Sequence, residues 1–308
     1  MDYTNPLRRH ARQLRRFAIA AKQPATRRHG VVVGAHWWDG HPNFGDDMTP
    51  WLLPRYGVVP VHRRPAEARL AGVGSILEFL PPTFDGAIWG SGLMYDRPYA
   101  LPRAHVLAVR GHLTRERIGA PEGVALGDPG ILVARRLRRT STRWDVGLVP
   151  HGHHTSHAPF LALAEAAGLR VRVIDVHRTA AHTVREIGAC GTIVTTSLHG
   201  LVTADAYGIP AVWTTLEPPL SGGAFKFLDY ESVITPGASR ALSFDERMPL
   251  HEILAHAAPA PRETVEAACD GLETAIGRLT ETLGALPRFP QGIGRVIASR
   301  GRATVASA

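Results

Sequence analysis

Features typical of secreted and membrane-spanning proteins are scarce in this 308-residue sequence. Its two cysteines, Cys190 and Cys269, are too few for a disulfide framework or a cysteine-rich metal site. No apolar run approaches the ~20 residues that cross a bilayer, and no long apolar core of a secretory signal follows the charged beginning. With 44% apolar and 20% charged residues, the chain is expected to be a globular protein of the cytoplasm.

Several catalytic and cofactor signatures are also missing. The sequence has no usable Gly-x-Ser-x-Gly motif of a Ser-His-Asp hydrolase. The glycine pairs at 72–75 and 90–92 lack the third glycine and the acidic residue of a dinucleotide-binding fingerprint, so they favour tight turns or close backbone approaches. Catalysis by two carboxylates fits poorly, because only Asp46 and Asp47 stand out as an acidic cluster.

The net charge of +8 is concentrated at one end of the chain. Residues 1–29 hold eight basic residues against one acidic residue, so the remainder is nearly neutral. A nucleic-acid-binding surface would need basic residues across the body of the protein, and we expect no nucleic-acid partner. In the same segment Leu7, Leu14 and small alanines recur at helical spacing opposite the arginines. This pattern predicts a basic amphipathic helix, with a solvated tail as the alternative.

Short apolar runs alternate with helical patterns, which predicts an α/β fold with parallel sheets. The expected strands are 30–34, 70–73, 86–89, 105–109, 144–149, 171–174, 192–196 and 211–213. The expected helices are 112–118, 159–168, 181–189, 200–207 and about 261–283. Because residues 135–143 are basic and polar, we predict two Rossmann-like doubly wound domains facing a cleft, at 30–140 and 141–285, between the basic segment 1–29 and an irregular tail 286–308.

The clearest local pattern runs from Thr195 to Pro210. An apolar run is followed by a helical stretch that Gly208 and Pro210 end. Ser197 is expected to cap this helix, and His199 stands at its start. The N–H groups and the dipole there favour an anion and keep an imidazole neutral until one binds. A polar residue that merely fills a helix start is the alternative interpretation.

Loops after the expected strands carry mostly basic side chains, which suits a small, highly charged anion. They supply Asn43, Asp46, Asp47, Arg110, His151, His153, His154, His199 and Lys226. The histidine-rich run 151–157 lies in a loop, with no cysteine nearby and without the ligand spacing usual for zinc. We predict anion contact there and no metal; a solvated loop and a metal site remain alternatives.

Seven short motifs follow one another in an order that resembles the polysaccharide pyruvyl transferase family, most closely its bacterial, succinoglycan-type exopolysaccharide branch. They are Asn43-Phe44-Gly45-Asp46-Asp47, Gly90-Ser91-Gly92, Arg110-Gly111 with Thr114, Gly127-Asp128-Pro129, Val149-Pro150-His151, Ser197-Leu198-His199-Gly200 with Gly208-Ile209-Pro210, and Phe225-Lys226-Phe227. The similarity covers roughly residues 30–235. It implies the two-domain fold of B-type glycosyltransferases. It also implies transfer of pyruvate from phosphoenolpyruvate to two hydroxyls of one sugar, in a polysaccharide or its lipid-linked precursor, as a cyclic ketal and without a cofactor.

The resemblance also assigns roles to single residues. It implies that His199 is a general acid and that Arg110 contacts the donor. The family often has an arginine two residues before the histidine, where this chain has Ser197, so Lys226 or His151 would replace that contact.

The chemistry of the acceptor, rather than a family motif, suggests further roles. Asp46 or Asp47 would take a hydroxyl proton, while Trp37 and Trp38 would stack on sugar rings; a cap for Asp46 and core packing for one tryptophan are the alternatives. Substrate contacts are also expected at Asn43, Ser197 and Gly200.

Two other functions stay open. One is a B-type glycosyltransferase using a nucleotide sugar, for which Glu217 is the nearby acidic candidate. The other is a non-catalytic sugar- or anion-binding protein, which the serine at position 197 suggests. Acceptors of the family are commonly assembled on a lipid carrier at the cytoplasmic membrane face. The basic segment is therefore predicted to contact anionic lipid reversibly, with a helix packed on the first domain as the alternative.

Overall fold

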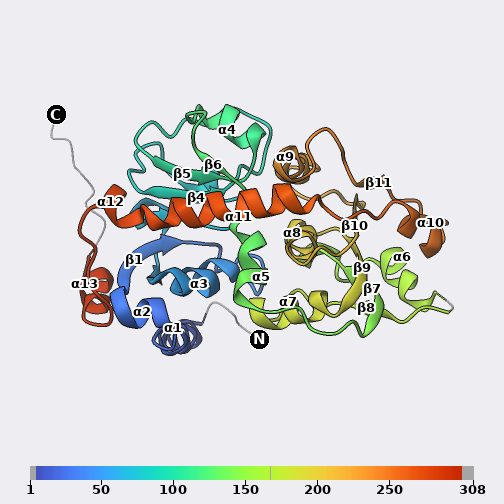
Figure 1. Ribbon diagram of the computed structural model, residues 1–308, viewed down its shortest axis with the longest axis horizontal. Coiled ribbons are helices and arrows are strands. Elements are labelled where there is room, and N and C mark those ends of the chain that lie inside the picture. Colours follow the sequence, from blue (N-terminus) through green and yellow to red (C-terminus); the bar gives the residue numbers. More distant parts are fainter. Residues whose placement is uncertain (1–4, 167, 300–308) are drawn as a thin grey trace.

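A computed structural model describes residues 5–166 and 168–299, and within them the chain folds around two parallel sheets (Figure 1). The first sheet has the order β2-β1-β3-β4-β5-β6, with strands Val31–His36 (β1), Val58–His62 (β2), Leu70–Ala71 (β3), Ala87–Ser91 (β4), His105–Val109 (β5) and Ala125–Leu126 (β6). The second has the order β11-β10-β9-β7-β8, with strands Trp144–Val149 (β7), Val171–Val173 (β8), Cys190–Thr195 (β9), Ala211–Thr215 (β10) and Ala241–Ser243 (β11). The predicted α/β fold class with two doubly wound sheets is confirmed.

Helices flank both sheets. They are Pro6–Ala20 (α1), Pro24–His29 (α2), Met48–Leu52 (α3), His112–Ile118 (α4), Val133–Arg136 (α5), Ala158–Ala162 (α6), Ala180–Gly188 (α7), Leu198–Ala206 (α8), Phe225–Ile234 (α9), Leu250–Ala255 (α10), Arg262–Gly277 (α11), Leu279–Leu283 (α12) and Gly292–Ala298 (α13). A short 3₁₀ turn at Pro129–Leu132 (η4) leads into α5. No helix in the described ranges is long and apolar enough to cross a membrane.

The order of the strands fixes where a ligand can meet both sheets. In each sheet the winding reverses next to the first strand, between β1 and β3 and between β7 and β9. Loops at the carboxyl ends of such neighbouring strands leave the sheet in opposite directions and open a crevice. Strand β2 was not predicted from the sequence, because Pro60 interrupts its apolar run. Proline has no N–H to donate to a neighbouring strand, and it is tolerated here because β2 lies at the edge of the sheet.

The C-terminal helices return to the first sheet. Helix α11 lies over the strands of the first sheet (Figure 1), and the indole Nε1 of Trp89 on β4 donates a 2.9 Å hydrogen bond to the carbonyl of Leu272 on α11. Val296 of α13 packs with Val32 and Val61 of the first sheet. Residues 262–277, which the sequence places in the second domain, thus pack on strands of the first sheet as well as on α9. Residues 286–299 are not an irregular tail, since α13 forms there; residues 300–308 of the predicted tail lie outside the described range.

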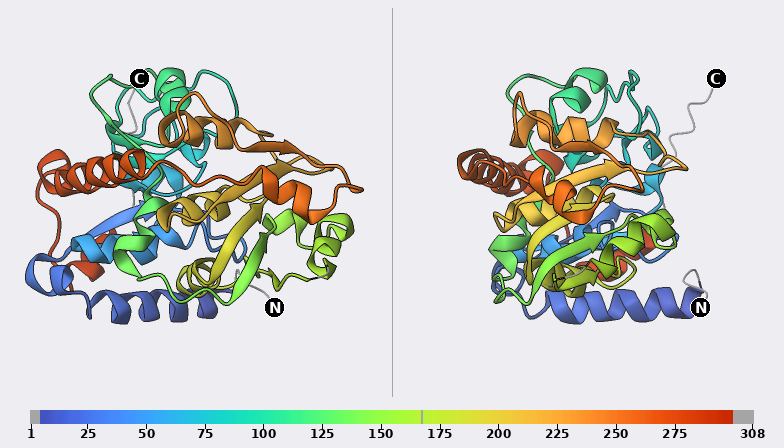
Figure 2. Two further views of the ribbon diagram at one scale, coloured as in Figure 1. Left: turned by 45° about the vertical axis from the view of Figure 1, so that its right-hand side comes forward. Right: turned by 90° about the vertical axis from the view of Figure 1, so that its right-hand side faces the viewer.

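Helix α1 confirms the predicted helix in segment 1–29, whose first four residues lie outside the described range. It lies along one edge of the molecule (Figure 2). An amphipathic helix usually packs its apolar side on the protein, but here leucines of α1 point to solvent and an arginine contacts the protein. Leu7 and Leu14 are 80% and 64% exposed, while Arg12 pairs with Asp39 at 3.4 Å. Since no acidic side chain follows for many residues along the helix itself, its arginines find their partners in the loop after β1.

Candidate active site

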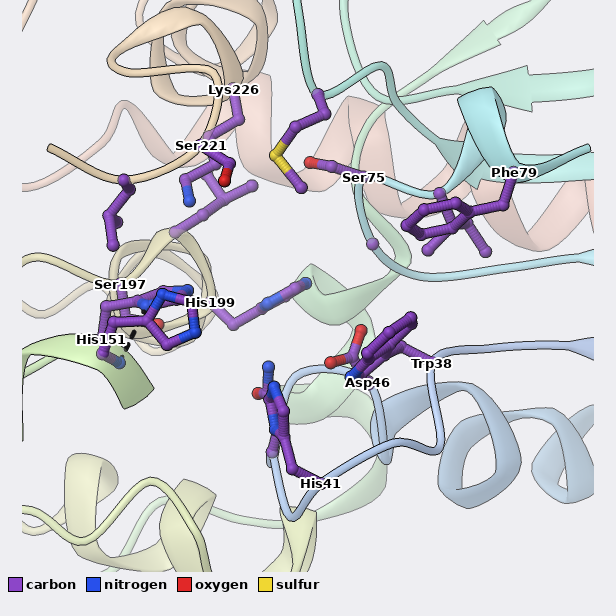
Figure 3. Close-up of a pocket in the computed structure, with 17 residues that line it drawn as sticks. Trp38, His41, Asp46, Ser75, Phe79, His151, Ser197, His199, Ser221 and Lys226 are labelled. Atoms are coloured by element: carbon purple, nitrogen blue, oxygen red, sulfur yellow. Dashed lines mark hydrogen bonds between the residues drawn. The ribbon is translucent and has the colours of Figure 1, made fainter. Parts of the chain in front are cut away.

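A cavity of about 220 Å³ opens between the two sheets, at the carboxyl ends of β1, β3, β7 and β9 (Figure 3). Seven of the residues expected from the sequence to contact substrate line it: Trp38, Asn43, Asp46, His151, Ser197, His199 and Lys226. Figure 3 shows His151, Ser197 and His199 on one side and Trp38 and Asp46 across from them. The expected cleft thus collects residues from both domains, as the strand order predicts.

His199 is the second residue of α8 and its side chain is 12% exposed. The ring lies tight against Gly45, where an added Cβ would come within 2.1 Å of Nδ1, so only glycine fits beside it. Burial lowers the pKa of His199, Asp128 raises it, and the cations Lys226 and Arg110 lower it further. His199 is therefore neutral while the pocket holds no anion, as the helix start predicted.

Ser197 occupies the N-cap position of α8, but its hydroxyl makes no capping hydrogen bond, so that part of the prediction was wrong. The hydroxyl oxygen of Thr195 accepts the 2.9 Å hydrogen bond from the Ser197 amide. Ser197 therefore faces the cavity without being used as a cap. The start of this nine-residue helix keeps donor capacity for an anion.

Asp46 and Lys226 are the two oppositely charged groups of the pocket. Burial raises the pKa of Asp46 to about 7, and the ammonium of Lys226 lowers it. Burial lowers the pKa of Lys226 to about 8, Arg110 adds to that effect, and Asp46 opposes it. Both groups therefore exchange protons near neutral pH, which is typical of catalytic and ligand-binding groups.

His151 supplies a neutral imidazole. Burial, followed by the charge of Lys226 and the neighbouring histidines, lowers its pKa to about 2. Its Nδ1 accepts a 3.2 Å hydrogen bond from the amide of His153, so Nε2 carries the proton and can donate to a ligand.

An aromatic wall faces these polar groups. Trp38 is 39% exposed and its ring stacks on Phe79 at 5.7 Å between centroids. Trp37, by contrast, is 1% exposed and belongs to the core, so the alternative of core packing for one tryptophan is confirmed at Trp37. Sequence analysis did not select His41, Ser75, Phe79, Met94 and Ser221, which also line the cavity. A glycine-rich turn before Ser75 was the one local signal, and it pointed equally well to a structural role.

Three further predicted site residues, Arg110, Asp47 and Gly200, do not line the cavity. Arg110 is fully buried, with Nε donating to Asp229 (2.8 Å) and Nη2 to the carbonyl of Leu93 (2.6 Å). Its Nη1 donates to the hydroxyl of Ser75 (2.5 Å), so Arg110 meets the pocket only through that serine. Partners within the chain thus occupy all three guanidinium nitrogens, and the predicted direct contact with a ligand is corrected.

Asp47 and Gly200 have structural positions. Asp47 accepts a 2.8 Å hydrogen bond from Arg16 and a 3.2 Å hydrogen bond from the amide of Ala180 at the start of α7. An added Cβ at Gly200 would lie 2.4 Å from the hydroxyl oxygen of Thr195, so this glycine lets α8 pack on β9. Neither residue lines the cavity, so the structure gives their predicted substrate contacts no support.

The histidines of the run 151–157 lie in different surroundings. His153 lines the cavity, His154 is buried against the hydroxyl of Thr196 (3.0 Å), and His157 accepts from the amide of Phe160 at the start of α6. Over residues 5–166 and 168–299 no group of three or more His, Cys, Asp or Glu side chains is arranged to hold a metal ion.

Comparison with known proteins shows similarity to one family. Residues 79–217 match the family described as polysaccharide pyruvyl transferase. The chain is 31% identical over 216 residues to succinoglycan biosynthesis protein ExoV of Rhizobium meliloti (strain 1021), a match that covers 65% of this chain and 64% of that protein. The chain thus spans slightly less than two thirds of this relative's length.

Two solved structures are similar at low identity. One, of uncharacterised function from Klebsiella pneumoniae, matches 79% of this chain and 99% of its own, with 12% identity and a TM-score of 0.42. The other is an alpha-glucosyltransferase in complex with UDP and DNA, which matches 88% of this chain and 100% of its own, with 8% identity and a TM-score of 0.31. Of the cavity residues, His151, Ser197 and His199 lie inside the family match, while Trp38, Asp46 and Lys226 lie outside it.

Proposed function

We propose, from the match to the polysaccharide pyruvyl transferase family and the similarity to succinoglycan biosynthesis protein ExoV, that the chain belongs to this family and transfers a pyruvyl group to a sugar during exopolysaccharide synthesis. We further propose phosphoenolpyruvate as the donor and two hydroxyls of one sugar as the acceptor, with a cyclic ketal as the product. The observation that carries the proposal is a single cavity that combines a helix start, Lys226, His199 and Asp46.

The donor has two anionic groups, a carboxylate and a phosphate, and the cavity offers groups for both. The ammonium of Lys226, the first-turn amides of α8 and the Nε2–H of His151 would hold them. Negative charge beside His199 raises the pKa of its imidazole and opposes the effect of burial. Binding of the donor would thereby convert His199 from a neutral ring into a charged acid.

Proton transfer then starts the reaction. His199 would protonate the methylene carbon of the donor, which places oxocarbenium character on the carbon that bears carboxylate and phosphate. One sugar hydroxyl adds to that carbon and gives its proton to the carboxylate of Asp46. Phosphate leaves, and a second hydroxyl closes the ketal and releases its proton to the departing phosphate. Asp46 releases its proton to solvent, and a proton from solvent restores His199.

The aromatic wall suits the acceptor. The face of a sugar ring carries C–H groups that pack on aromatic faces, and the Trp38–Phe79 pair offers such a surface next to Asp46. Arg110 would act on the donor through Ser75 and through its positive charge, without direct contact. A nucleotide-sugar donor finds less support, because Glu217 is exposed and does not line the cavity.

Contact with an anionic membrane surface is part of the same proposal. Leu7 and Leu14 lie exposed on α1, and the side chains of Arg8 and Arg15 on the same helix are exposed as well. An apolar stripe beside free cations is the pattern of a helix that lies on a lipid surface. Such contact would bring the pocket close to an acceptor carried on lipid.

The direct test is incubation with phosphoenolpyruvate and an acceptor glycan. We expect release of inorganic phosphate together with a glycan mass gain equal to pyruvate less water. His199→Asn keeps a polar side chain at the start of α8 and should lower the rate by ~10²- to 10⁴-fold, the usual contribution of a general acid. Phosphate release without the mass gain, or a near-normal rate in folded His199→Asn, would contradict the proposal.

A further inference from the structure

Two buried polar atoms face each other directly behind the pocket, without a hydrogen-bond partner in the described part of the chain. They are Nε2 of His199 and Oδ2 of Asp128, and 3.7 Å separates them. Buried polar atoms are nearly always paired, so two orphans that oppose each other require an explanation. A shift of less than 1 Å would bring them to ordinary hydrogen-bond distance.

The backbone around Asp128 fixes this geometry. Asp128 is fully buried at the start of η4, and its Oδ1 accepts a 2.8 Å hydrogen bond from the amide of Gly130. That bond anchors one carboxylate oxygen and leaves the other directed at His199. Gly130 has no side chain, and an added Cβ would lie 3.1 Å from Val202 on α8, so η4 and α8 pack closely. Asp128 follows the first sheet and His199 belongs to the second, so the pair forms across the two domains.

We propose that Asp128 is the positioning residue of His199: its carboxylate accepts the Nε2 proton, fixes the ring against Gly45 and stabilises the charged imidazolium. Nδ1 is then the nitrogen that exchanges a proton with the ligand. The acid role of His199 rests on the proposed function, whereas the Asp128–His199 pair can be measured without any turnover. In the sequence, Asp128 stands in the Gly127-Asp128-Pro129 motif, which by itself assigns the residue no role.

The charges around the ring explain why a counter-ion is needed there. Lys226 and Arg110 both disfavour an imidazolium at position 199, and burial acts in the same direction. His151 is neutral and gives no compensation. Among the interactions that set the pKa of His199, Asp128 alone acts in the opposite direction until an anion binds. The paired carboxylate therefore makes protonation possible at a site that otherwise resists it.

The test measures the imidazole directly, by nitrogen NMR of histidine-labelled protein without substrate. In the wild type we expect the Nε2–H tautomer of His199, assigned by comparison with His199→Asn. Asp128→Asn keeps the oxygen that accepts from Gly130 and removes the charge. In this variant we expect the apparent pKa of His199 to fall by at least one pH unit, a tenfold loss of proton affinity, and the Nδ1–H tautomer to gain population.

Asp145→Asn is the matched control. It removes one carboxylate from a surface pair with Arg170 at the beginning of β7, far along the strand from the pocket. This variant should leave the tautomer and the pKa of His199 as in the wild type. An unchanged tautomer and pKa in folded Asp128→Asn would overturn the proposal. If Asp128→Asn does not fold, the wild type still decides, because an Nδ1–H tautomer leaves Nε2 no proton to give to Asp128.

Turnover supplies a separate readout. If His199 is the acid, Asp128→Asn should lower kcat and move the high-pH limit of kcat to lower pH, since a weaker base loses its proton earlier. If the wild type shows the Nε2–H tautomer but no activity toward phosphoenolpyruvate, the proposed function is wrong and the Asp128–His199 pair stands. If the wild type is active but shows the Nδ1–H tautomer, the pair is wrong and the proposed function stands.

Discussion

Two clusters of charge lie side by side in this molecule and differ in how completely they are paired. Around Arg110, hydrogen bonds from Nε, Nη1 and Nη2 go to Asp229, Ser75 and the carbonyl of Leu93, and Asp229 accepts further bonds from Thr114. Around Lys226 and His199, polar atoms are left without partners or have pKa values displaced toward neutrality. The satisfied cluster holds the two domains in register, while the unsatisfied one has interactions left to offer a ligand.

Removing the satisfied arginine should have the largest effect on the fold. Arg110→Met leaves the fully buried carboxylate of Asp229 without its cation, and breaking a buried pair from one side costs about 3–5 kcal/mol. Chemical denaturation should report this loss. The matched control is Arg170→Met, which breaks an exposed pair with Asp145 and should change stability little. Equal stability of the two variants would show that the Arg110 cluster does not hold the domains together.

Removing the unsatisfied lysine should act on binding instead. Lys226→Met takes away a buried cation, so we expect stability to be maintained and the affinity for phosphoenolpyruvate to fall by about 1.5–3 kcal/mol, the value of a charged contact. Isothermal titration calorimetry with phosphoenolpyruvate measures this affinity in the wild type and in Lys226→Met. The chain's other lysine, exposed Lys22, provides the same substitution as a control. A donor affinity that survives in Lys226→Met would place the anion elsewhere.

The pH profile sharpens the comparison, because both charged pocket groups titrate near neutrality. The carboxylate of Asp46 is lost as the pH falls through about 7, and the ammonium of Lys226 is lost as the pH rises through about 8. These two groups favour a high kcat/KM between those values, while the lowered pKa of the acid His199 in the free enzyme moves the maximum toward the acidic value. Lys226 lowers the pKa of Asp46, so Lys226→Met should move the acidic limit upward, by up to about one pH unit or 1.4 kcal/mol. An acidic limit that stays in place would separate Asp46 from the profile.

The smallest effect is expected at α1, whose arginines also divide into paired and unpaired ones. Arg12 and Arg16 bind Asp39 and Asp47, whereas Arg15 is exposed. Arg15→Gln should weaken sedimentation with anionic vesicles by about fivefold, since one charge contributes about 1 kcal/mol near such a surface.

Arg247→Gln, exposed in the loop after β11, is the control for that measurement. Full-length protein that ignores anionic vesicles at low salt would exclude the membrane contact. Deleting the whole segment is a poorer test than a point substitution, because Arg16 holds Asp47 next to the pocket residue Asp46.

Much of the site followed from local patterns. The period of apolar residues identified eight of the strands, and the carboxyl ends of parallel strands meet at one edge of a sheet. For that reason the loops after these strands supplied most of the cavity, His199 included. The burial of Arg110 against Asp229 could not be predicted from local patterns, because the two residues are 119 positions apart in the sequence.

The sequence by itself determined the alternation of strands and helices, the helix start that carries His199 and the identity of the loops that end near it. These features depend on residues within a few positions of one another, where periodicity and capping act. Only the tertiary structure decided which charged groups pair within the protein and which can still bind a ligand. Arg110 pairs with Asp229 and Arg16 with Asp47, whereas Asp128 lies opposite His199 in the unsatisfied cluster. Burial and Coulomb interactions set those outcomes, and both depend on which distant segments come into contact.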